Sequence, residues 1–288
     1  MLRHTPLTVL RLSILFFGVC SVGLAQAPSG GTGTYSFEDE ALSGRQIAEQ
    51  IRRNYRPIYS VTVEHYLSRL GARIASQIPD ARFPFTFGVI EDDPCEATHE
   101  AIAAPGGYVF VPSQLFVAAK GEAEFAGMLA DAMEAVATGY RVVLARHRRQ
   151  LGKLPRISIS GRICEEQQTV PQSQEESRAQ VYVKEVHDMA LDVDTLAIEA
   201  MSRAGFDPEA LVRYIERVEP TTHIASTTLP GRDERLAAMR SAIARLPQST
   251  YVTHDDEFTA IQEELLNSRL TQPITTPPAH TPTRLVSS

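Results

Sequence analysis

The sequence predicts an α+β protein that is mainly helical and contains one small β-sheet. Apolar residues recur at helical spacing over most of the chain between residues 38 and 269. Two short segments near residues 83–90 and 108–111 instead alternate in polarity or concentrate β-forming residues. With 288 residues, of which 43% are hydrophobic and 22% charged, the chain can bury a sizeable core.

Residues 1–27 have the features of a secretory signal peptide. Arg3 and Arg11 give a basic start, an apolar run covers 12–24, and the triplet 25–27 (Ala-Gln-Ala) is a small-x-small cleavage signature. The run is too short to span a bilayer comfortably, although an uncleaved anchor is the alternative. No other apolar run approaches membrane length. We therefore expect an exported protein, periplasmic or extracellular, without a stable membrane span after cleavage.

Charge and cysteine content narrow the possible partners. Lys and Arg total 28 against 35 Asp and Glu, a net charge of −7, which predicts no nucleic-acid partner and no binding to an anionic membrane surface. Cys95 and Cys164 would remain after export to an oxidising compartment. They are compatible with one disulfide or with two unpaired thiols.

The first half of the mature chain predicts two helices followed by strands. Residues 28–37 read as a flexible lead-in, and helical patterns cover residues 38–55 and 61–78. Residues 83–90 alternate with a period of two, which is typical of a half-buried strand. Pro105-Gly106-Gly107 predicts a turn into a second strand, Tyr108–Val111.

The second half predicts helices around a polar loop. The strongest helix runs from residue 122 to 148, with Glu122 and Glu124 in its first turn and arginines at its end. Residues 150–177 are polar and predict a mobile loop, and residues 270–288 are Thr/Pro-rich and predict a disordered tail. The remaining predicted helices cover residues 178–203, 208–218 (opened by Asp207-Pro208), 233–246 and 256–269.

The common catalytic signatures are absent from the sequence. It has no Gly-rich phosphate loop, no Cys-x-x-Cys, no Gly-x-Ser-x-Gly and no His-Glu-x-x-His. The eight histidines are scattered, and none lies within one helical turn of another.

An ordered set of segments nevertheless resembles one family. The segments are Tyr66–Gly71, Ala101–Val111, Glu122–Ala130, Ala204–Pro208 and Thr227–Pro230 with Arg235. Together they resemble the gluzincin zinc metallopeptidases related to the CAAX prenyl protease and the periplasmic beta-barrel-assembly-enhancing protease. The resemblance implies a metallopeptidase-like domain over residues 38–269, with a small β-sheet beside the former zinc-binding helix.

The resemblance also implies a substrate groove. In the family, the second segment forms a turn and an edge strand along which the substrate lies. The matching groove residues are Gly106, Gly107, Tyr108 and Val109. An edge strand over Tyr108–Val111 would accept an extended polypeptide by strand addition, which needs backbone groups rather than zinc.

The zinc-binding helix departs from the family at every position that carries chemistry. Where the family has His-Glu-x-x-His, this chain has Asp-Ala-Met-Glu-Ala. The first ligand position therefore falls on Asp131, the general base on Ala132 and the second ligand on Ala135. Alanine offers neither a metal donor nor a proton acceptor.

The later positions have changed as well. The family's Glu ligand falls on Ala190, while its Asp, which orients a ligand from one turn away, is retained as Asp194. The late His that would help to bind an oxyanion falls on Leu229. The resemblance therefore implies zinc in the related active enzymes but no cofactor and no intact catalytic residue here.

Three functional interpretations follow. The preferred one is a zinc-less pseudopeptidase that binds polypeptide or acts in envelope protein maintenance. The alternatives are an active zinc metalloendopeptidase with non-standard ligands and a structural envelope protein. A carboxylate site for a hard cation is a further alternative to solvated acidic helix faces, which we prefer; its candidate residues are Asp131, Glu134, Asp188, Asp192 and Asp194.

Overall fold

The structure is a computed structural model that describes residues 36–79, 81–91, 100–140, 142–143, 176–219, 229–251 and 255–271. The predicted signal peptide, Cys95, Cys164, nearly all of the 150–177 loop and most of the 270–288 tail lie outside these residues. The predicted lead-in is described only at its end, where the first helix already begins at Phe37.

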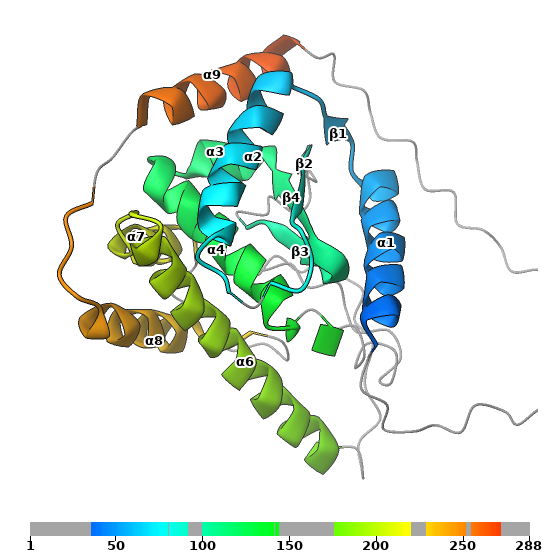
Figure 1. Ribbon diagram of the computed structural model, residues 1–288, viewed down its shortest axis with the longest axis vertical. Coiled ribbons are helices and arrows are strands. Elements are labelled where there is room, and N and C mark those ends of the chain that lie inside the picture. The colour runs from blue at the N-terminus through cyan, green and yellow to red at the C-terminus, as the bar shows by residue number, and fades with distance from the viewer. Residues whose placement is uncertain are drawn as a thin grey trace, which may run out of the picture. The chain divides into compact units, whose positions relative to one another are not determined.

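The architecture is mainly helical with one small mixed sheet, which confirms the predicted α+β class (Figure 1). The helices are α1 (Phe37–Asn54), α2 (Val61–Ala75), α3 (Ser113–Ala118), α4 (Glu122–Ala137), α6 (Glu176–Arg203), α7 (Glu209–Val218), α8 (Arg232–Arg245) and α9 (Asp255–Thr271). The strands are β1 (Pro57–Ile58), β2 (Thr86–Ile90), β3 (Ile102–Ala104) and β4 (Tyr108–Pro112), with a 3-10 turn η1 (Pro105–Gly107) between the last two. The sequence patterns did not reveal α3, β1 or β3.

The sheet has the strand order β1-β2-β4-β3, so β4 is an interior strand. It pairs in parallel with β2 and antiparallel with β3. The prediction that Tyr108–Val111 is an edge strand is therefore wrong. The physical reason is the turn before it: Gly106 and Gly107 adopt φ values of 78° and 91°, which reverse the chain and fold β3 back onto β4.

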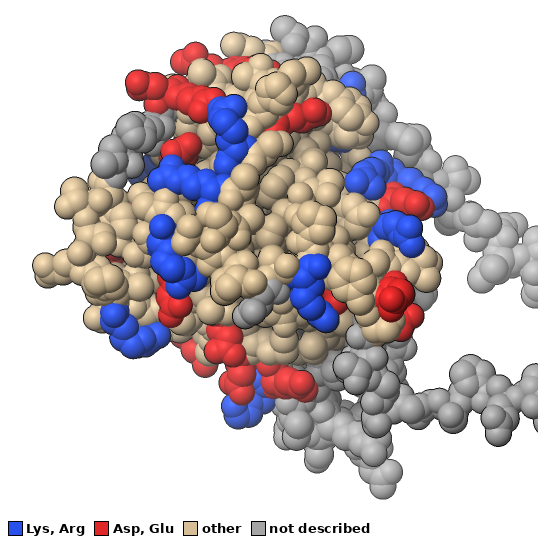
Figure 2. Space-filling model, in the orientation of Figure 1, with Lys and Arg blue, Asp and Glu red and all other residues tan. Residues whose placement is uncertain are grey.

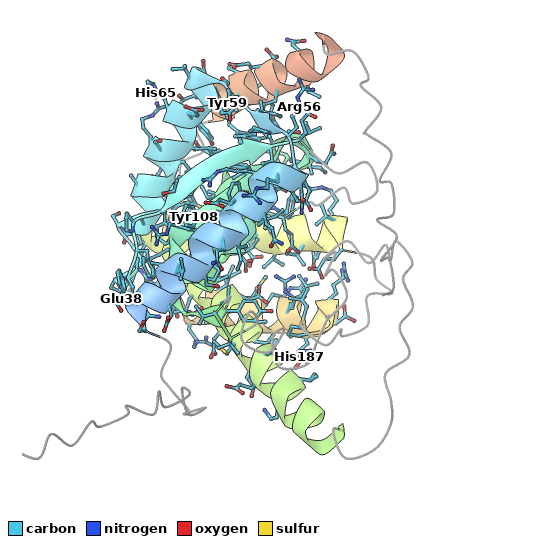
Figure 3. The ribbon with its side chains drawn as sticks, turned by 90° about the vertical axis from the view of Figure 1, so that its right-hand side faces the viewer. Glu38, Arg56, Tyr59, His65, Tyr108 and His187 are labelled. Carbon is cyan, nitrogen blue, oxygen red and sulfur yellow. The ribbon has the colours of Figure 1, made fainter. Side chains whose placement is uncertain are left out.

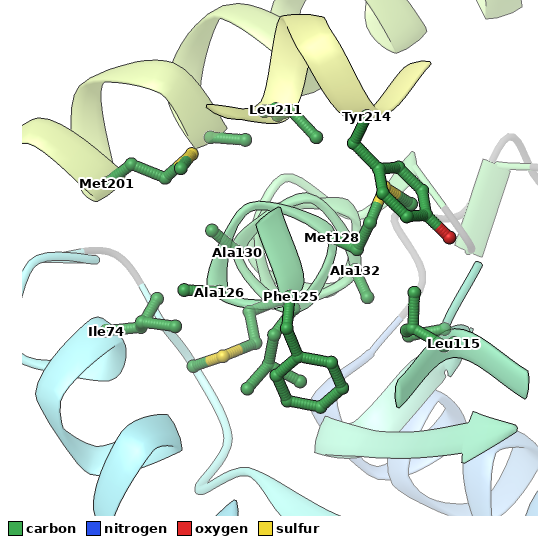
Figure 4. Close-up of a cluster of buried hydrophobic side chains, with 14 of the residues drawn as sticks. Ile74, Leu115, Phe125, Ala126, Met128, Ala130, Ala132, Met201, Leu211 and Tyr214 are labelled. Carbon is green, nitrogen blue, oxygen red and sulfur yellow. The ribbon is translucent and has the colours of Figure 1, made fainter. Parts of the chain in front are cut away.

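Helix α4 is the centre of the main hydrophobic core. Every residue from Ala123 to Ala130 is buried, as expected of a helix that is apolar on all sides. Figure 4 looks along α4 and shows it enclosed by side chains of neighbouring elements, among them Ile74 of α2, Met201 of α6 and Leu211 of α7.

The C-terminal end of α4 differs from the prediction of a helix to residue 148. The helix ends at Ala137, where Thr138 caps it and its hydroxyl donates to the Glu134 carbonyl oxygen at 2.8 Å. Gly139 follows with φ 74°, a left-handed conformation that commonly ends helices. The prediction extended the helix past this glycine because the arginines near residue 148 are typical of a helix C-terminus.

Helix α1 lies against η1 and the start of the sheet. Gly44 faces the turn so closely that a Cβ there would overlap the carbonyl oxygen of Pro105. Ala48 and Ile51 continue this contact into a second core cluster with Ile90 and Phe110.

Helix α9 contacts α4 and α2 through aromatic rings and α3 through hydrogen bonds. The Phe258 ring lies 5.3 Å from Phe125 and 6.2 Å from Tyr66, measured between ring centroids. The side-chain amide of Gln262 donates to the carbonyl oxygens of Phe116 at 2.6 Å and Ala119 at 2.8 Å. Residues 255–271 are thus packed onto the core by both apolar and polar contacts.

Acidic and basic side chains are interspersed on the face drawn in Figure 2. Many exposed arginines pair with a nearby carboxylate, as Arg69 does with Glu257 and Arg203 with Glu199. Within the described residues, no helix combines the length and apolar character needed to cross a membrane.

The close approach of α1 to η1 predicts that Gly44→Ala destabilises the protein. In an open helix interior this change adds about 1 kcal/mol of stability, because alanine is the better helix former. Here the added methyl group must push α1 away from the backbone at Pro105, and overpacking costs about 1–3 kcal/mol. Urea unfolding would measure the difference. The exposed neighbour Gln46→Ala is the matched control, and a more stable Gly44→Ala variant would contradict the prediction.

Candidate functional site

The positions singled out by the family resemblance lie on two helices that pack together, α4 and α6 (Figure 1). Asp131 and Ala135 are one turn apart on α4, and Ala190 and Asp194 are one turn apart on α6. Ala135 and Ala190 are 1% and 5% exposed and belong to the same core cluster. The structure therefore places these positions on two packed helices, with both alanines in the same core cluster.

Two further positions border this region. Ala132, the position matched to the general base, is 1% exposed within α4. Leu229, matched to the late histidine, precedes α8 and packs from the edge against the same core cluster. Both side chains make apolar packing contacts.

The polar feature of this region is a group that we call the Arg235 cluster: Arg235, Asp194, Glu219, Glu100 and Asp131. The Arg235 Nε and Nη2 atoms donate to the two oxygens of Asp194 at 3.0 and 2.8 Å, and Nη1 donates to Glu219. Nη1 also lies 3.8 Å from Oε1 of Glu100, and Nη2 lies 4.0 Å from Oδ1 of Asp131. One guanidinium thus faces four carboxylates.

The cluster is almost entirely removed from solvent. Arg235 is 2% exposed and Asp194 is 1% exposed. Burial alone would lower the pKa of Arg235, but the charges of Asp194, Glu219 and Glu100 outweigh it and hold that pKa well above its usual value. Arg235 is therefore a permanent buried cation.

Sequence reasoning identified only part of this cluster. Asp131, Asp194 and Arg235 came from the family resemblance, whereas Glu100 and Glu219 were missed. Glu219 is the residue that follows α7, and Glu100 stands two residues before β3. Single acids at the ends of elements carry no periodic signal that distinguishes them from surface residues.

The acidic residues of α4 and α6 differ in their exposure to solvent. Asp188 and Asp192 are exposed, and Asp188 pairs with Lys184 at 2.6 Å, which confirms the solvated interpretation for α6 at these positions. Glu134 and Asp194 are buried, so for them that interpretation is wrong. Within the described ranges, no three His, Cys, Asp or Glu side chains are arranged to hold a metal ion.

The two histidines within the described residues, His65 and His187, lie far from each other. Figure 3 shows His65 on α2 and His187 on α6 toward opposite ends of the view. Neither belongs to the Arg235 cluster.

The residues matched to the family groove lie under α1. Gly107 and Val109 are buried, while Gly106 and Tyr108 are half-buried. The Arg52 guanidinium of α1 lies 5.6 Å from the centre of the Tyr108 ring. The edge of this part of the sheet is β3, which forms a ladder with β4 on one side only among the described strands.

A second charged contact fixes the start of α4. Arg217 Nη1 donates to Oε1 of Glu124 at 2.9 Å, and its Nη2 donates to the Ala118 carbonyl oxygen at 2.8 Å. The Lys120 amide donates to Oε2 of Glu124 at 2.8 Å. Burial, together with the Glu100 charge, raises the pKa of the neighbouring Tyr214, so this tyrosine stays neutral.

Two hollows on the surface lie elsewhere. One, of about 570 Å³, is lined by the start of α7 and the segment after α8, and includes Asp207 and Tyr251. The other, of about 500 Å³, lies at the start of α4 and includes Glu124 and Arg217. Neither is lined by Asp131, Ala135 or Ala190.

Comparison with known proteins relates this chain to bacterial proteases, in agreement with the resemblance drawn from the sequence. The relatives are beta-barrel assembly-enhancing proteases. That of Yersinia pestis is 24% identical over 239 residues, which cover 78% of this chain and 48% of the relative. That of Escherichia coli (strain K12) is 22% identical over 240 residues, covering 79% and 48%. The chain thus spans about half the length of these relatives, and no protein-family model matches it.

Proposed function

We propose that this chain is an exported, zinc-less homologue of a zinc metalloendopeptidase, a pseudopeptidase that binds polypeptide or acts in envelope protein maintenance. The observation that carries the proposal is the set of residues on the matched ligand and base positions: Asp131, Ala132, Ala135 and Ala190. Three of these four side chains are single methyl groups.

The donor set does not fit a catalytic zinc ion. Such an ion takes three protein ligands and keeps one open position for water. Here at most one inherited donor, Asp131, remains. Without a residue at position 132 that can accept a proton, the attacking water would also lack its general base.

The surroundings of these positions support the same conclusion. Ala135 and Ala190 are buried in an apolar cluster, where a metal ion would meet methyl groups instead of donors. Asp131 lies 4.0 Å from the Arg235 guanidinium, a fixed positive charge that would repel a dication. A metal ion in this region would therefore face both a lack of donor atoms and the positive charge of Arg235.

The polypeptide and envelope parts of the proposal rest on the relatives and on the sheet. The relatives' name refers to beta-barrel assembly, and the first 27 residues resemble a signal peptide. The chain retains the small sheet, whose edge strand β3 has backbone groups that could pair with an extended chain. An active zinc peptidase and a structural protein without ligands are the outcomes that the tests below separate.

The first prediction from this proposal concerns zinc stoichiometry. The unmodified protein, incubated with zinc and desalted, should retain no stoichiometric metal by elemental analysis. The variant Asp131→His, Ala132→Glu, Ala135→His and Ala190→Glu should bind about one zinc per chain, because it restores three ligands. Residues 131 and 135 are four apart and share a helix face, as a two-histidine site requires.

The matched control keeps Ala190 and carries only the other three substitutions. It offers two ligands, so its zinc should be lost on desalting, whereas that of the four-substitution variant is retained. Circular dichroism verifies that both variants fold. Tight, stoichiometric zinc in the unmodified protein would refute the pseudopeptidase proposal.

The second prediction concerns polypeptide binding at β3. A permanently unfolded probe, reduced and carboxymethylated α-lactalbumin, should slow amide hydrogen exchange at residues 102–104, because strand addition engages the backbone at the edge of the described sheet. Protection should stay unchanged on α9, which packs against α3. Binding without protection at β3, or no binding at all, would favour the structural alternative.

The third prediction concerns the N-terminus. Mature protein isolated from the cell envelope should begin near Gln26 or Pro28, because the apolar run ends in a cleavage signature. Intact mass spectrometry would measure this. A bulk product that still begins at Met1 would argue for the uncleaved anchor.

A further inference from the structure

We infer that the outer edge of strand β2, at residues 85–87, is a second site for strand addition. The segment that fits this edge is an extended polypeptide in which apolar and basic residues alternate. The inference extends the polypeptide-binding part of the proposed function to the other side of the sheet from β3. It depends neither on the loss of zinc nor on binding at β3.

Strand β1 covers only part of the outer edge of β2. Strand β2 spans Thr86–Ile90 and pairs with β4 along its whole length. Strand β1 contains only Pro57 and Ile58, which pair with Ile90 and Val89. Within the described residues, no strand pairs with the remainder of β2 on this side.

The backbone groups that β1 leaves uncovered are those of Phe87. The Glu91 amide donates to the Arg56 carbonyl oxygen at 2.8 Å, so the backbone groups of Glu91 point toward the β1 side. Peptide groups alternate in direction along a strand, and those of Val89 and Phe87 therefore point the same way. Val89 meets Ile58, but Phe87 lies beyond the end of β1. Among the described strands, the N–H and C=O of Phe87 are thus left to an added strand.

Helix α2 begins before β1 can reach Phe87. Continued antiparallel pairing would place Ser60 opposite Phe87. The Ser60 carbonyl oxygen instead accepts from the Glu64 amide at 2.9 Å, and the Ser60 side chain caps the helix. The chain therefore turns away from the sheet at this residue, which leaves the edge of β2 open.

The side chains around this edge are accessible to solvent. Tyr59 and Val61, at the turn from β1 into α2, are 83% and 71% exposed. Thr86 is exposed as well, and Phe85 and Phe87 are half-buried. Strand β2 contains none of the charged residues or prolines that commonly protect an edge from pairing. The edge can therefore accept a further strand.

The rings of Phe85 and Phe87 determine the apolar positions of the partner. Their centroids are 6.5 Å apart with an interplanar angle of 24°, and both rings pack against the main core cluster. In an antiparallel pair, residues directly opposite each other place their side chains on the same face of the sheet. Aromatic or β-branched residues opposite the two rings would pack against them, while the residues between would point to the other face. The partner therefore needs apolar residues at alternate positions.

Charge favours basic residues at the intervening positions. Two carboxylates belong to the start of α2 and its contacts: Glu64 is in the first turn of the helix, and Glu264 of α9 accepts a hydrogen bond from Ser60. The whole chain has a net charge of −7. A segment with Lys or Arg at its polar positions is therefore attracted to this edge, whereas a second copy of this chain is repelled.

A peptide that alternates Lys with Phe or Val tests the inference by NMR on the whole protein. In the free protein, the Phe87 amide should exchange with solvent faster than the Gly88 amide, because the latter points toward β4. An excess of peptide should slow exchange at Phe87 and leave α7 unchanged. No slowing at Phe87, or full protection of Phe87 before peptide is added, would overturn the inference.

Backbone methylation of the peptide distinguishes strand addition from other apolar contacts. A residue opposite Phe87 exchanges both of its backbone hydrogen bonds with Phe87, so the N–H groups that bind belong to the apolar residues of the peptide. Methylating the backbone nitrogens of these residues should abolish the protection of Phe87, whereas methylating those of the Lys residues should retain it. Equal effects of the two methylation patterns would contradict strand addition.

Two substitutions at Thr86 test the charge preference. Thr86 is exposed, and its side chain points to the face opposite that of Phe87, on which the Lys side chains of the peptide would lie. Thr86→Glu should tighten binding and Thr86→Lys should weaken it, each by up to about fivefold, as expected for cross-strand charge pairs. Ala72→Lys, at an exposed position of α2, is the matched control and should change the affinity much less. Equal affinities of the two Thr86 variants would contradict a basic partner.

Exchange at residues 102–104 separates this site from the one proposed at β3. Slowing at Phe87 alone supports the β2 site and counts against strand addition at β3. Slowing at residues 102–104 alone overturns the β2 site and leaves the proposed function standing. Slowing at both places supports two separate edges for polypeptide.

Discussion

The buried pairing of Arg235 with Asp194 is the interaction on which the arrangement of the helices around α4 depends. A guanidinium at 2% exposure is tolerated only where oriented carboxylates replace its water. This requirement fixes α8 against α6 at one register, because both oxygens of Asp194 must meet Nε and Nη2 together. Helix α6 in turn forms one wall of the core around α4. A charged contact thus determines how apolar surfaces meet.

Alanine at positions 135 and 190 has a consequence for packing as well as for chemistry. Both side chains are buried in the core cluster to which α4 and α6 contribute, and small residues allow packed helices to approach closely. Ligand side chains at these positions would need space and polar partners. The alanines present at both positions instead continue the hydrophobic core. Restoring the donors would have to reopen that core.

Periodicity predicted most helices because burial of one face is a property of neighbouring residues, and α1, α2, α6, α8 and α9 were found near their predicted bounds. It failed where a single backbone angle decides the outcome, as at Gly139, which ends α4, and at Gly106 and Gly107, which make β4 interior. The residues of the Arg235 cluster likewise fall into those that the sequence could predict and those that it could not. Asp131, Asp194 and Arg235 could be found through the order of family segments, whereas Glu100 and Glu219 reach Arg235 only through tertiary folding.

Catalysis and polypeptide binding depend on different parts of such a fold. Zinc chemistry needs donors from two helices held within a few tenths of an ångström, whereas strand addition needs only the backbone of an edge strand. The two can therefore be lost separately. In this chain the matched helices and the strand edge are physically connected, because Glu100 belongs to the Arg235 cluster and lies two residues before β3. The Arg235 cluster thereby connects the start of the strand edge to α4 and α6. A domain without catalytic donors can in this way retain a positioned surface for an extended chain.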